Sequence, residues 1–368
     1  MKSIKTLKRI KGKTILLRVD FNVPIKIKEK GKRNRKEEIN DYHILDDFRI
    51  RKAIPTVKYL VEKGADVLII THLGKDGSIG LLPIEKRFFK LSHLPQGRVS
   101  FFRNIRAFKE EEENNTRFAK KLSRLGDIYV NDAFSVSHRA HASVVGIPKY
   151  LPSFSGFQLE KEIQNLSLAL KSPRRPFLFI LGGAKFSTKI PLIKKYIELA
   201  DYVFVGGSIA NYFLKMKGYE IGKSLVDDEK YNVKNYLKNE KLILPIDVVV
   251  ALGKKKINKE INEIQKNDTI IDIGEKTTKV LVDLVQRSKI IVWNGPLGKY
   301  EDGGDKSTRE ILRVVAKSKN KSILGGGDTV ALVSQMGIEG KFTLVSTGGG
   351  ATLEFLAKGV LPGIEALG

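Results

Sequence analysis

The stretch from Phe177 to Gly183 reads FLFILGG: five apolar residues followed directly by two glycines. A continuous apolar run of this length is typical of a strand buried in a parallel sheet. Glycine after such a strand lets the chain turn sharply and leaves backbone N–H groups open to a ligand. The same pattern recurs in the second half of the chain, at residues 202–207, 290–296, 323–327 and 342–350.

These glycine turns predict a phosphate-binding site. Most of them lead into segments with helical spacing, and a helix N-terminus offers unpaired N–H donors and a favourable dipole to a phosphate. Any single turn could be no more than a tight connection between a strand and a helix. Five turns, with Lys185 and Lys189 four residues apart beside the first, favour a nucleotide or polyphosphate site.

The composition indicates a two-domain α/β protein. At 368 residues the chain is too long for one ordinary core, and 42% hydrophobic residues with 33 glycines fit this class. No apolar run is long enough for a transmembrane helix, and the start, MKSIK, lacks the apolar region of a secretory signal. The absence of cysteine excludes disulfides, cysteine–zinc sites and thiol catalysis. We therefore expect a cytoplasmic protein.

The net charge of +25 arises from 66 Lys and Arg against 41 Asp and Glu. Such an excess suits either a nucleic-acid-binding protein or an enzyme of highly anionic substrates. The dense basic segment at residues 26–36 lies between an expected strand and an expected helix, and it lacks aromatic residues for base stacking. It is therefore predicted to be a solvated loop.

Strands and helices also alternate in the first half. Residues 14–19, 67–71, 99–102 and 128–130 are predicted strands, and residues 50–61 have the apolar spacing of a helix. Alternation through both halves predicts parallel sheets with helices on both faces. A helix at residues 159–170, closed by Pro173 and Pro176, is the expected connector between the two domains.

Polar residues follow the expected strands of the first half, where open α/β sheets bind their ligands. We expect basic side chains there to converge on an anion, since the planar fork of arginine grips carboxylate and phosphate. Unrelated surface arginines are the alternative for any one of them. The candidates are Arg49, His72, Arg106, Arg139 and His141. A metal pair at His138 and His141 is disfavoured, because the chain has no cysteine and no H-E-x-x-H pattern.

Two acidic residues of the second half are candidate nucleotide ligands. Asp328 follows three glycines before an expected helix, so it is either the N-cap or a ligand of Mg²⁺ on a nucleotide. Glu301, in a loop after Gly298, could accept hydrogen bonds from ribose hydroxyls. Residues 218–224 come close to a P-loop but are one residue short and follow a helix-like segment, so we reject that motif.

A series of ordered stretches resembles the phosphoglycerate kinase family over residues 14–368. In the first half they are RVDFNVP at 18–24, RIRKAIPTV at 49–57, HLG at 72–74, NDAF at 131–134 and HRAHAS at 138–143. In the second half they are LGGAKFSTKI at 181–190, LPIDVVVA at 244–251, WNGPLG at 293–298, GGGDT at 325–329 and STGGGATLEFL at 346–356.

The resemblance implies two Rossmann-like domains. Residues 1–156, with a returning segment at about 352–368, would bind 3-phosphoglycerate or 1,3-bisphosphoglycerate. Residues 157–351 would bind ADP or ATP with Mg²⁺, and residues 157–171 would form a hinge helix. The implied reaction is in-line phosphoryl transfer between 1,3-bisphosphoglycerate and ADP, reversible, without a phospho-enzyme and with domain closure. A monomer with no specific nucleic-acid or membrane partner is expected.

The resemblance also implies roles for particular residues. The phosphoglycerate would be held by Asp20, Phe21, Asn22, Arg49, His72, Leu73, Gly74, Lys75, Arg106 and Arg139. The nucleotide would be held by Lys189, Asn294, Glu301, Gly326, Gly327, Asp328 and Thr329, with Asp328 serving Mg²⁺ through the nucleotide. The moving phosphoryl group would be stabilised by Arg49, Lys185, Gly326 and Gly327.

The chain departs from the family pattern at several positions. Lys75 stands where arginine is usual, Arg103 where glutamate precedes asparagine, Ser208 where a third glycine is common and Glu275 where proline is common. Residues 81–97 look shorter than usual, which predicts a trimmed N-terminal sheet. A basic nucleic-acid-binding protein on a kinase-like scaffold is the alternative function.

Overall fold

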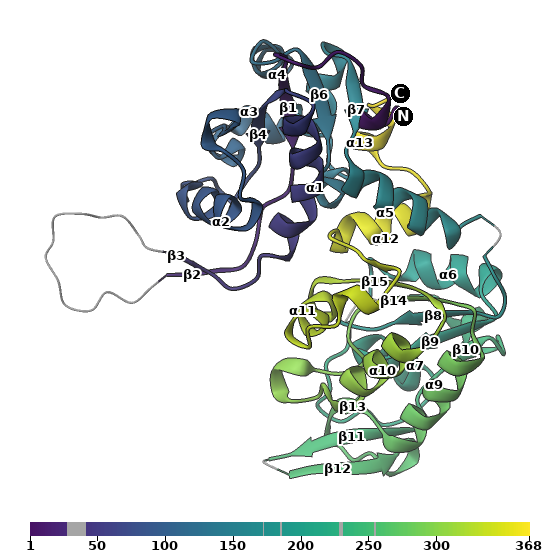
Figure 1. The fold of residues 1–368 in the computed structure, drawn as a ribbon. Helices are drawn as coiled ribbons and strands as arrows, with labels where there is room; N and C mark the ends of the chain where they lie inside the picture. The colour runs from purple at the N-terminus through teal and green to yellow at the C-terminus, as the bar shows by residue number, and fades with distance from the viewer. Residues whose placement is uncertain (28–41, 172, 185, 228–230, 254) are drawn as a thin grey trace, which may run out of the picture. The chain divides into compact units, whose positions relative to one another are not determined.

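The computed structural model describes residues 1–27, 42–171, 173–184, 186–227, 231–253 and 255–368 (Figure 1). The chain forms two compact units. Unit 1 comprises residues 1–163 and 360–368, and unit 2 comprises residues 164–359. The domain boundaries expected from the sequence are 156/157 and 351/352. In the structure the first part of the hinge helix, to residue 163, belongs to unit 1, and the returning segment begins at residue 360.

Unit 1 is built on a parallel five-stranded sheet in the order β5-β4-β1-β6-β7. Its strands are β1 (Thr14–Arg18), β4 (Asp66–Ile70), β5 (Val99–Phe101), β6 (Ile128–Asn131) and β7 (Ser153–Ser155). Its helices are α1 (Phe48–Glu62), α2 (Leu82–Ser92), α3 (Lys109–Glu112), α4 (Thr116–Ser123) and α13 (Pro362–Glu365). The predicted strands of the first half are therefore confirmed, and β7 was not predicted.

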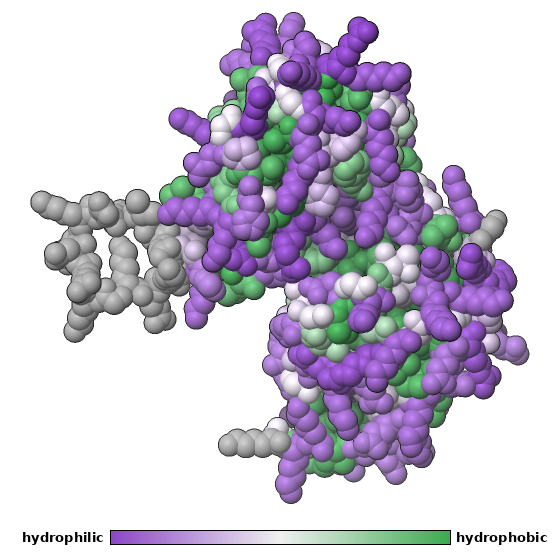
Figure 2. Space-filling model, viewed as in Figure 1, coloured by the Kyte–Doolittle hydropathy of each residue, from purple (hydrophilic) through white to green (hydrophobic). Residues whose placement is uncertain are grey.

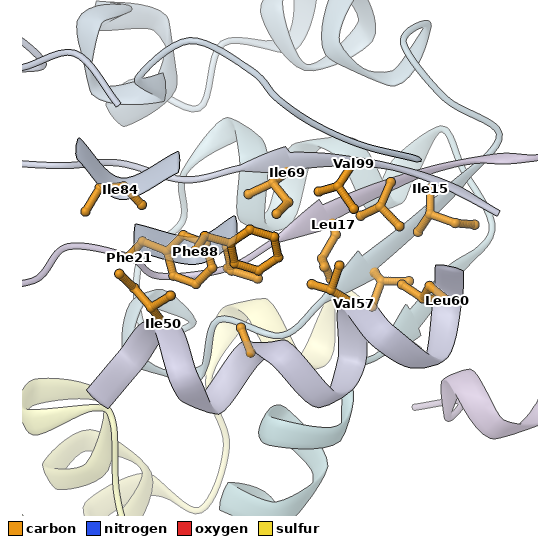
Figure 3. Close-up of a cluster of buried hydrophobic side chains, with 14 of the residues drawn as sticks. Ile15, Leu17, Phe21, Ile50, Val57, Leu60, Ile69, Ile84, Phe88 and Val99 are labelled. Carbon is orange, nitrogen blue, oxygen red and sulfur yellow. The ribbon is translucent and has the colours of Figure 1, made fainter. Parts of the chain in front are cut away.

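Helix α1 packs on this sheet because its apolar residues recur every three or four positions. Ile50, Val57 and Leu60 are fully buried and meet Leu17 and Ile69 from the sheet (Figure 3). Burying each such side chain contributes about 1.5–3 kcal/mol. The same core holds an aromatic group from β5, α2 and the turn after β1, formed by Phe21, Phe88, Phe89 and Phe101.

A short antiparallel hairpin, β2 (Ile25–Ile27) with β3 (Tyr42–Ile44), leaves unit 1 after β1. Lys26 belongs to β2, which differs from the solvated loop predicted for residues 26–36. The rest of that basic segment lies outside the described residues apart from Ile27.

Unit 2 contains a parallel six-stranded sheet in the order β10-β9-β8-β14-β15-β16. Its strands are β8 (Phe177–Leu181), β9 (Tyr202–Val205), β10 (Leu242–Ile243), β14 (Ile290–Asn294), β15 (Lys321–Gly325) and β16 (Leu344–Val345). Its helices are α6 (Ile190–Leu199), α7 (Gly207–Met216), α8 (Lys234–Leu237), α9 (Glu275–Arg287), α10 (Lys306–Lys317), α11 (Gly327–Gln335) and α12 (Gly349–Lys358). Each apolar run that precedes glycine is a strand of this sheet, as predicted.

Unit 2 also holds an antiparallel sheet that was not predicted. It consists of β11 (Asp247–Leu252), β12 (Lys255–Glu260) and β13 (Thr269–Ile273), in the order β12-β11-β13. Strand β12 reads KKINKE and has no apolar run, because it is an edge strand with largely exposed side chains. The second domain is thus not made of parallel sheet alone.

The predicted connector helix is α5 (Phe157–Leu168), which begins in unit 1 and ends in unit 2. It starts two residues earlier than the apolar spacing indicated. The last residues return to unit 1, where the Gly363 N–H donates to the Ser137 carbonyl over 2.8 Å and both termini lie near β7 (Figure 1). Hydrophilic side chains are spread over most of the visible surface of both units (Figure 2).

Candidate functional site

In unit 1, Asp20 and Arg49 meet at the carboxyl end of β1. Asp20 follows the strand, and Arg49 lies in the first turn of α1. The Arg49 Nη1 lies 2.8 Å from the Asp20 Oδ2 and 2.9 Å from the backbone carbonyl of Asn22. The Asn22 side chain in turn accepts the Gly74 N–H over 3.0 Å, which holds the turn after β4 beside the turn after β1. Gly74 adopts a positive φ of 76°, which glycine tolerates without strain.

His72 is buried in the same corner, and its Nδ1 lies 3.5 Å from the Asp20 Oδ1. Burial, with Arg18, Arg106 and Arg139 nearby, lowers the pKa of His72 to about 3, although Asp20 opposes this. The imidazole is therefore neutral at physiological pH. Burial alone would raise the pKa of Asp20, but Arg49, His72 and a hydrogen bond from Ser135 hold it well below its usual range.

Arg106 is carried by a buried 3₁₀ turn, Ile105–Ala107, directly after β5. Asn104 caps this turn by accepting the Arg106 N–H over 3.2 Å, and its amide donates to the carbonyls of Leu73 and Ile79. The guanidinium pairs with Glu112, whose side chain is half exposed. Asn104 thus fixes the Arg106 turn against the loop after β4.

Several buried polar atoms around this corner have no hydrogen-bond partner among the described residues. They include Arg18 Nη2, His72 Nδ1, Arg106 Nε and His141 Nδ1. Burial, together with the nearby Arg106, Arg139 and Arg18, lowers the pKa of His141 to about 4, so these groups lie close to one another. Unpaired buried donors are costly, and an anion would satisfy them. The arginine and histidine candidates therefore come together, while Arg139 itself is exposed.

Other predicted residues of unit 1 differ in their surroundings. The side chains of Phe21 and Leu73 are fully buried in the apolar core, so their contact with a ligand could come only through the backbone. Lys75 is exposed, as is Arg103. No role was assigned to Arg18 from the sequence. A charged residue at the end of the largely apolar strand β1 is the signal that could have identified it as a site residue.

In unit 2, the glycine turns after β8, β9 and β14 pack directly on one another. The Gly183 N–H donates to the Pro296 carbonyl over 2.8 Å, and the Gly207 N–H donates to the Leu297 carbonyl over 2.7 Å. A Cβ atom at Gly207 would lie 2.8 Å from the Gly183 nitrogen, which leaves no room for a side chain. These turns form part of the wall of a cavity of about 440 Å³.

The cavity is lined by residues of the three glycine turns and also by acidic residues. Glu301 and Asp328 face it, together with apolar residues such as Leu225, Val248 and Leu297. This volume and mixed lining are typical of a small-molecule site. Burial and Glu301 raise the pKa of Asp328, while Lys189 lowers it. Glu301 and Asp328 are thus near each other in one pocket.

Asp328 is not an N-cap. The N-cap of α11 is Gly326, at a φ of 90°, and Asp328 lies within the first helical turn. The N-cap alternative is therefore wrong, because the third glycine already belongs to the helix. Beside this turn, Asn294 Nδ2 and Thr329 Oγ1 are buried without partners among the described residues.

The first glycine turn carries a basic side chain. Lys189 is buried, and its Nζ donates to the Gly182 carbonyl. Lys185 lies outside the described residues. Ser208, where a third glycine is common, donates to the carbonyls of Gly183 and Ala184 over 3.1 and 2.8 Å, so it ties two of the glycine turns together.

Two features are absent from the described residues. No helix there is long and apolar enough to cross a membrane. Within those same residues, no group of three or more His, Asp or Glu is placed to hold a metal ion.

Two α/β units, one with a basic corner and the other with a glycine-walled cavity, are an architecture suited to a nucleotide-dependent phosphotransferase. The family model described as phosphoglycerate kinase matches residues 4–89 and 84–358. The chain belongs to the phosphoglycerate kinase family.

Individual relatives agree with the family match. The phosphoglycerate kinase of Dictyoglomus turgidum is 41% identical over 394 aligned positions, covering 97% of this chain and 96% of the relative. That of Borreliella burgdorferi strain ZS7 is 40% identical over 403 positions, covering 100% and 99%. Both alignments are longer than the 368 residues of this chain, and the family matches meet at residues 84–89, inside the segment predicted to be short.

Solved structures show the same fold. The phosphoglycerate kinase from Coxiella burnetii superposes with a TM-score of 0.83 at 36% identity, covering 99% of this chain and 98% of that one. The enzyme from Pyrococcus horikoshii OT3 gives a TM-score of 0.84 at 30% identity, covering 100% and 98%. The predicted α/β class with two Rossmann-like domains is therefore confirmed.

Proposed function

We propose that this protein transfers the acyl phosphate of 1,3-bisphosphoglycerate to ADP, reversibly, forming 3-phosphoglycerate and ATP in glycolysis. Membership of the phosphoglycerate kinase family supports this reaction over the nucleic-acid-binding alternative. The observation that carries the substrate assignment is the basic corner of unit 1, where Arg18 Nη2 and Arg106 Nε are buried without a hydrogen-bond partner among the described residues. A phosphoglycerate is a small anion of the kind that such donors require.

In this proposal unit 1 binds the phosphoglycerate. Arg49 has one nitrogen on Asp20 and Asn22, and the remaining donors of its fork are available to the carboxyl end of the substrate. Arg106, Arg139 and Lys75 would neutralise the phosphate, with His72 donating as a neutral imidazole. Asp20 and Asn22 would hold Arg49 and the Gly74 turn in place.

Unit 2 binds the nucleotide. The cavity is large enough for an adenosine, Glu301 would accept from the ribose, and Lys189 with the N-terminus of α11 would meet the phosphates. Asn294 and Thr329 each have, beside the same turn, a buried polar atom that finds no partner in the described part of the chain. Gly326 and Gly327 present backbone N–H groups there.

Asp328 would serve a Mg²⁺ ion carried by the nucleotide. Burial and the neighbouring Glu301 raise the pKa of Asp328, and a cation would relieve the repulsion between the two carboxylates, so the donor set fits the ion. Magnesium usually takes one or two protein carboxylates and completes its shell with phosphates and water. When bound, it would neutralise phosphate charge.

The chemistry needs alignment and charge neutralisation rather than covalent help. Arg49, Lys185 and the N–H groups at Gly326 and Gly327 would stabilise the charge on the transferring phosphoryl oxygens. The leaving group is a carboxylate, so no general acid is required. Domain closure would exclude water, and we propose that the enzyme acts as a cytoplasmic monomer.

The test is a coupled assay with the purified full-length protein. In the reverse direction, ATP and 3-phosphoglycerate should support saturable NADH oxidation through a coupling dehydrogenase, and omission of Mg²⁺ should abolish it. A folded protein without activity, yet retaining duplex DNA at 0.15 M salt, would instead favour the nucleic-acid-binding function.

A further inference from the structure

Ser143 lies at the end of the segment 138–143 that carries Arg139 and His141, and all its polar groups are engaged. It is the second residue of a single π-helical turn, Ala142–Gly146, and is fully buried. Its N–H donates to the Glu111 Oε2 over 2.8 Å, and its hydroxyl donates to the Glu111 Oε1 over 2.5 Å. One carboxylate thus receives both donors of Ser143.

Two further bonds fasten Ser143 to the sheet. Its hydroxyl oxygen accepts from the Arg18 Nε over 2.8 Å, and its carbonyl accepts the Tyr129 hydroxyl over 2.7 Å. Arg18 closes β1 and Tyr129 belongs to β6, so the segment is tied to two neighbouring strands. Arg18 and Glu111 are both fully buried, and Ser143 bridges them.

Glu111 connects this segment to the Arg106 turn. It belongs to α3, which follows the 3₁₀ turn of Arg106, and its own N–H donates to the Phe108 carbonyl over 3.1 Å. The Glu111 Oε1 also lies 3.8 Å from the His141 Nδ1. The Glu111–Ser143 link therefore sets the spacing between Arg106 on one segment and Arg139 with His141 on another.

We propose that Glu111 and Ser143 are positioning residues for the anionic substrate: they hold the Arg106 turn and the 138–143 segment at the separation that lets both meet one phosphate. This inference rests on the function proposed above. A buried charge pair adds little net stability, whereas it fixes geometry strongly because each partner is costly to leave unpaired. Neither residue contacts the substrate in this proposal.

The test uses the full-length Ser143→Ala and Glu111→Gln variants, with Glu110→Gln as the control. Glu110 is an exposed neighbour on α3. Ser143→Ala removes the hydroxyl bridge without changing charge, and we expect the KM for 3-phosphoglycerate to rise by up to roughly 10–150-fold, the factor that corresponds to losing a hydrogen bond to a charged group. The KM for ATP should stay within about twofold, because the nucleotide cavity belongs to unit 2.

Glu111→Gln separates positioning from simple electrostatics. The substitution removes a negative charge near the site, so long-range attraction alone would lower the KM for the anion. Positioning requires the opposite, a higher KM for 3-phosphoglycerate in this variant too. The Glu110→Gln control should leave both KM values unchanged.

Each outcome decides the proposal. Thermal unfolding and calorimetric titration with 3-phosphoglycerate show whether the folded variants bind it less tightly. A lower melting temperature with an unchanged KM for 3-phosphoglycerate would mean a structural role only, and a lowered KM in Glu111→Gln would mean an electrostatic one. An inactive wild-type enzyme would refute the function itself, whereas an active wild type with unaffected variants would refute only the positioning role.

Discussion

Arg49 donates a hydrogen bond to Asp20 across 2.8 Å, from Nη1 to Oδ2, and thereby joins the first turn of α1 to the end of β1. Asp20 is buried, whereas the side chain of Arg49 is 29% exposed. The pair keeps Asp20 ionised, because a buried carboxylate stays charged only where a cation or a hydrogen-bond donor compensates its charge. The same hydrogen bond fixes the orientation of the Arg49 guanidinium. Arg49 is thus held before any substrate arrives, which lowers the entropic cost of the transfer.

We expect Arg49→Ala to lower kcat by roughly 10²–10³, the scale for losing one donor to the transition state. Steady-state kinetics in both directions measures this. The matched control is Arg51→Ala, two residues along the same helix, whose guanidinium pairs with Asp47 instead. If Arg49→Ala retained kcat within about threefold of wild type, Arg49 would have no catalytic role.

We expect Asp328→Asn to weaken Mg-ADP binding more than metal-free ADP binding. The carboxylate lines the cavity and belongs to the first turn of α11 and not to its N-cap, so a loss confined to the metal complex would identify its role. Calorimetric titration with and without Mg²⁺ separates the two effects. Asp302→Asn, on the loop beside Glu301, is the control; equal losses with and without the metal would contradict the assignment.

We expect Ser208→Ala to raise the KM for ATP a few-fold while leaving the KM for 3-phosphoglycerate unchanged. The hydroxyl bonds two carbonyls of the turn that leads to Lys185 and Lys189, and one such bond contributes about 1 kcal/mol. Ser208→Gly restores the common family residue and tests whether the chain has come to depend on the hydroxyl. Equal ATP KM values in all three proteins would show that the turn holds its shape without it.

Asp132 makes stability depend on pH. Burial raises its pKa to about 7, although Thr56 and the N–H groups of Leu159 and Gln158 lower it. Between the ordinary value of 3.8 and about 7, the folded state therefore holds a proton that the unfolded state releases, so this group's contribution to the free energy of unfolding falls as pH rises through that window. His72 and His141, with lowered pKa values, act in the opposite sense between about 4 and 6.5.

Asp132→Asn should remove the first of these effects. The amide resembles the protonated acid, so the variant should gain stability relative to wild type between pH 5 and pH 8, by on the order of 2 kcal/mol at about 1.4 kcal/mol per pKa unit. Urea unfolding of both proteins at the two pH values measures the difference, in which the histidine contributions cancel. A stability difference that does not change with pH would show that Asp132 is ionised throughout.

Local patterns were enough to predict much of the fold. The strands β1, β4, β8, β9 and β14 were visible because a strand buried on both faces must be apolar throughout. Strand β12 was not visible, since an exposed edge strand such as KKINKE carries no apolar signal and forms only against β11. The hairpin of β2 and β3 was not predicted either, because each strand has only three residues and residues 28–41 separate the two strands along the chain.

The candidate site likewise contains residues that could be placed from the sequence and residues that could not. Residues at the ends of predicted strands, such as Asp20, His72 and Asp328, could be placed from the sequence because parallel strands bring their carboxyl ends to one edge. The buried residues that bond to these segments from behind could not be placed from the sequence. Glu111 and Ser143 are 32 residues apart, and their bond to each other and to Arg18 has no local signature.

The sequence by itself determined the α/β class, the glycine turns, the family resemblance and the residue types that are candidates for binding the substrates. These depend on short-range rules: apolar periodicity, the conformations open to glycine and the charge of single side chains. Only the tertiary structure decided which buried polar atoms have no partner among the described residues, how burial lowers the pKa values of His72 and His141, and which buried residues bond to one another. Those properties depend on burial and on distances between segments far apart in the chain, because desolvation and hydrogen bonding act through space and not along the sequence.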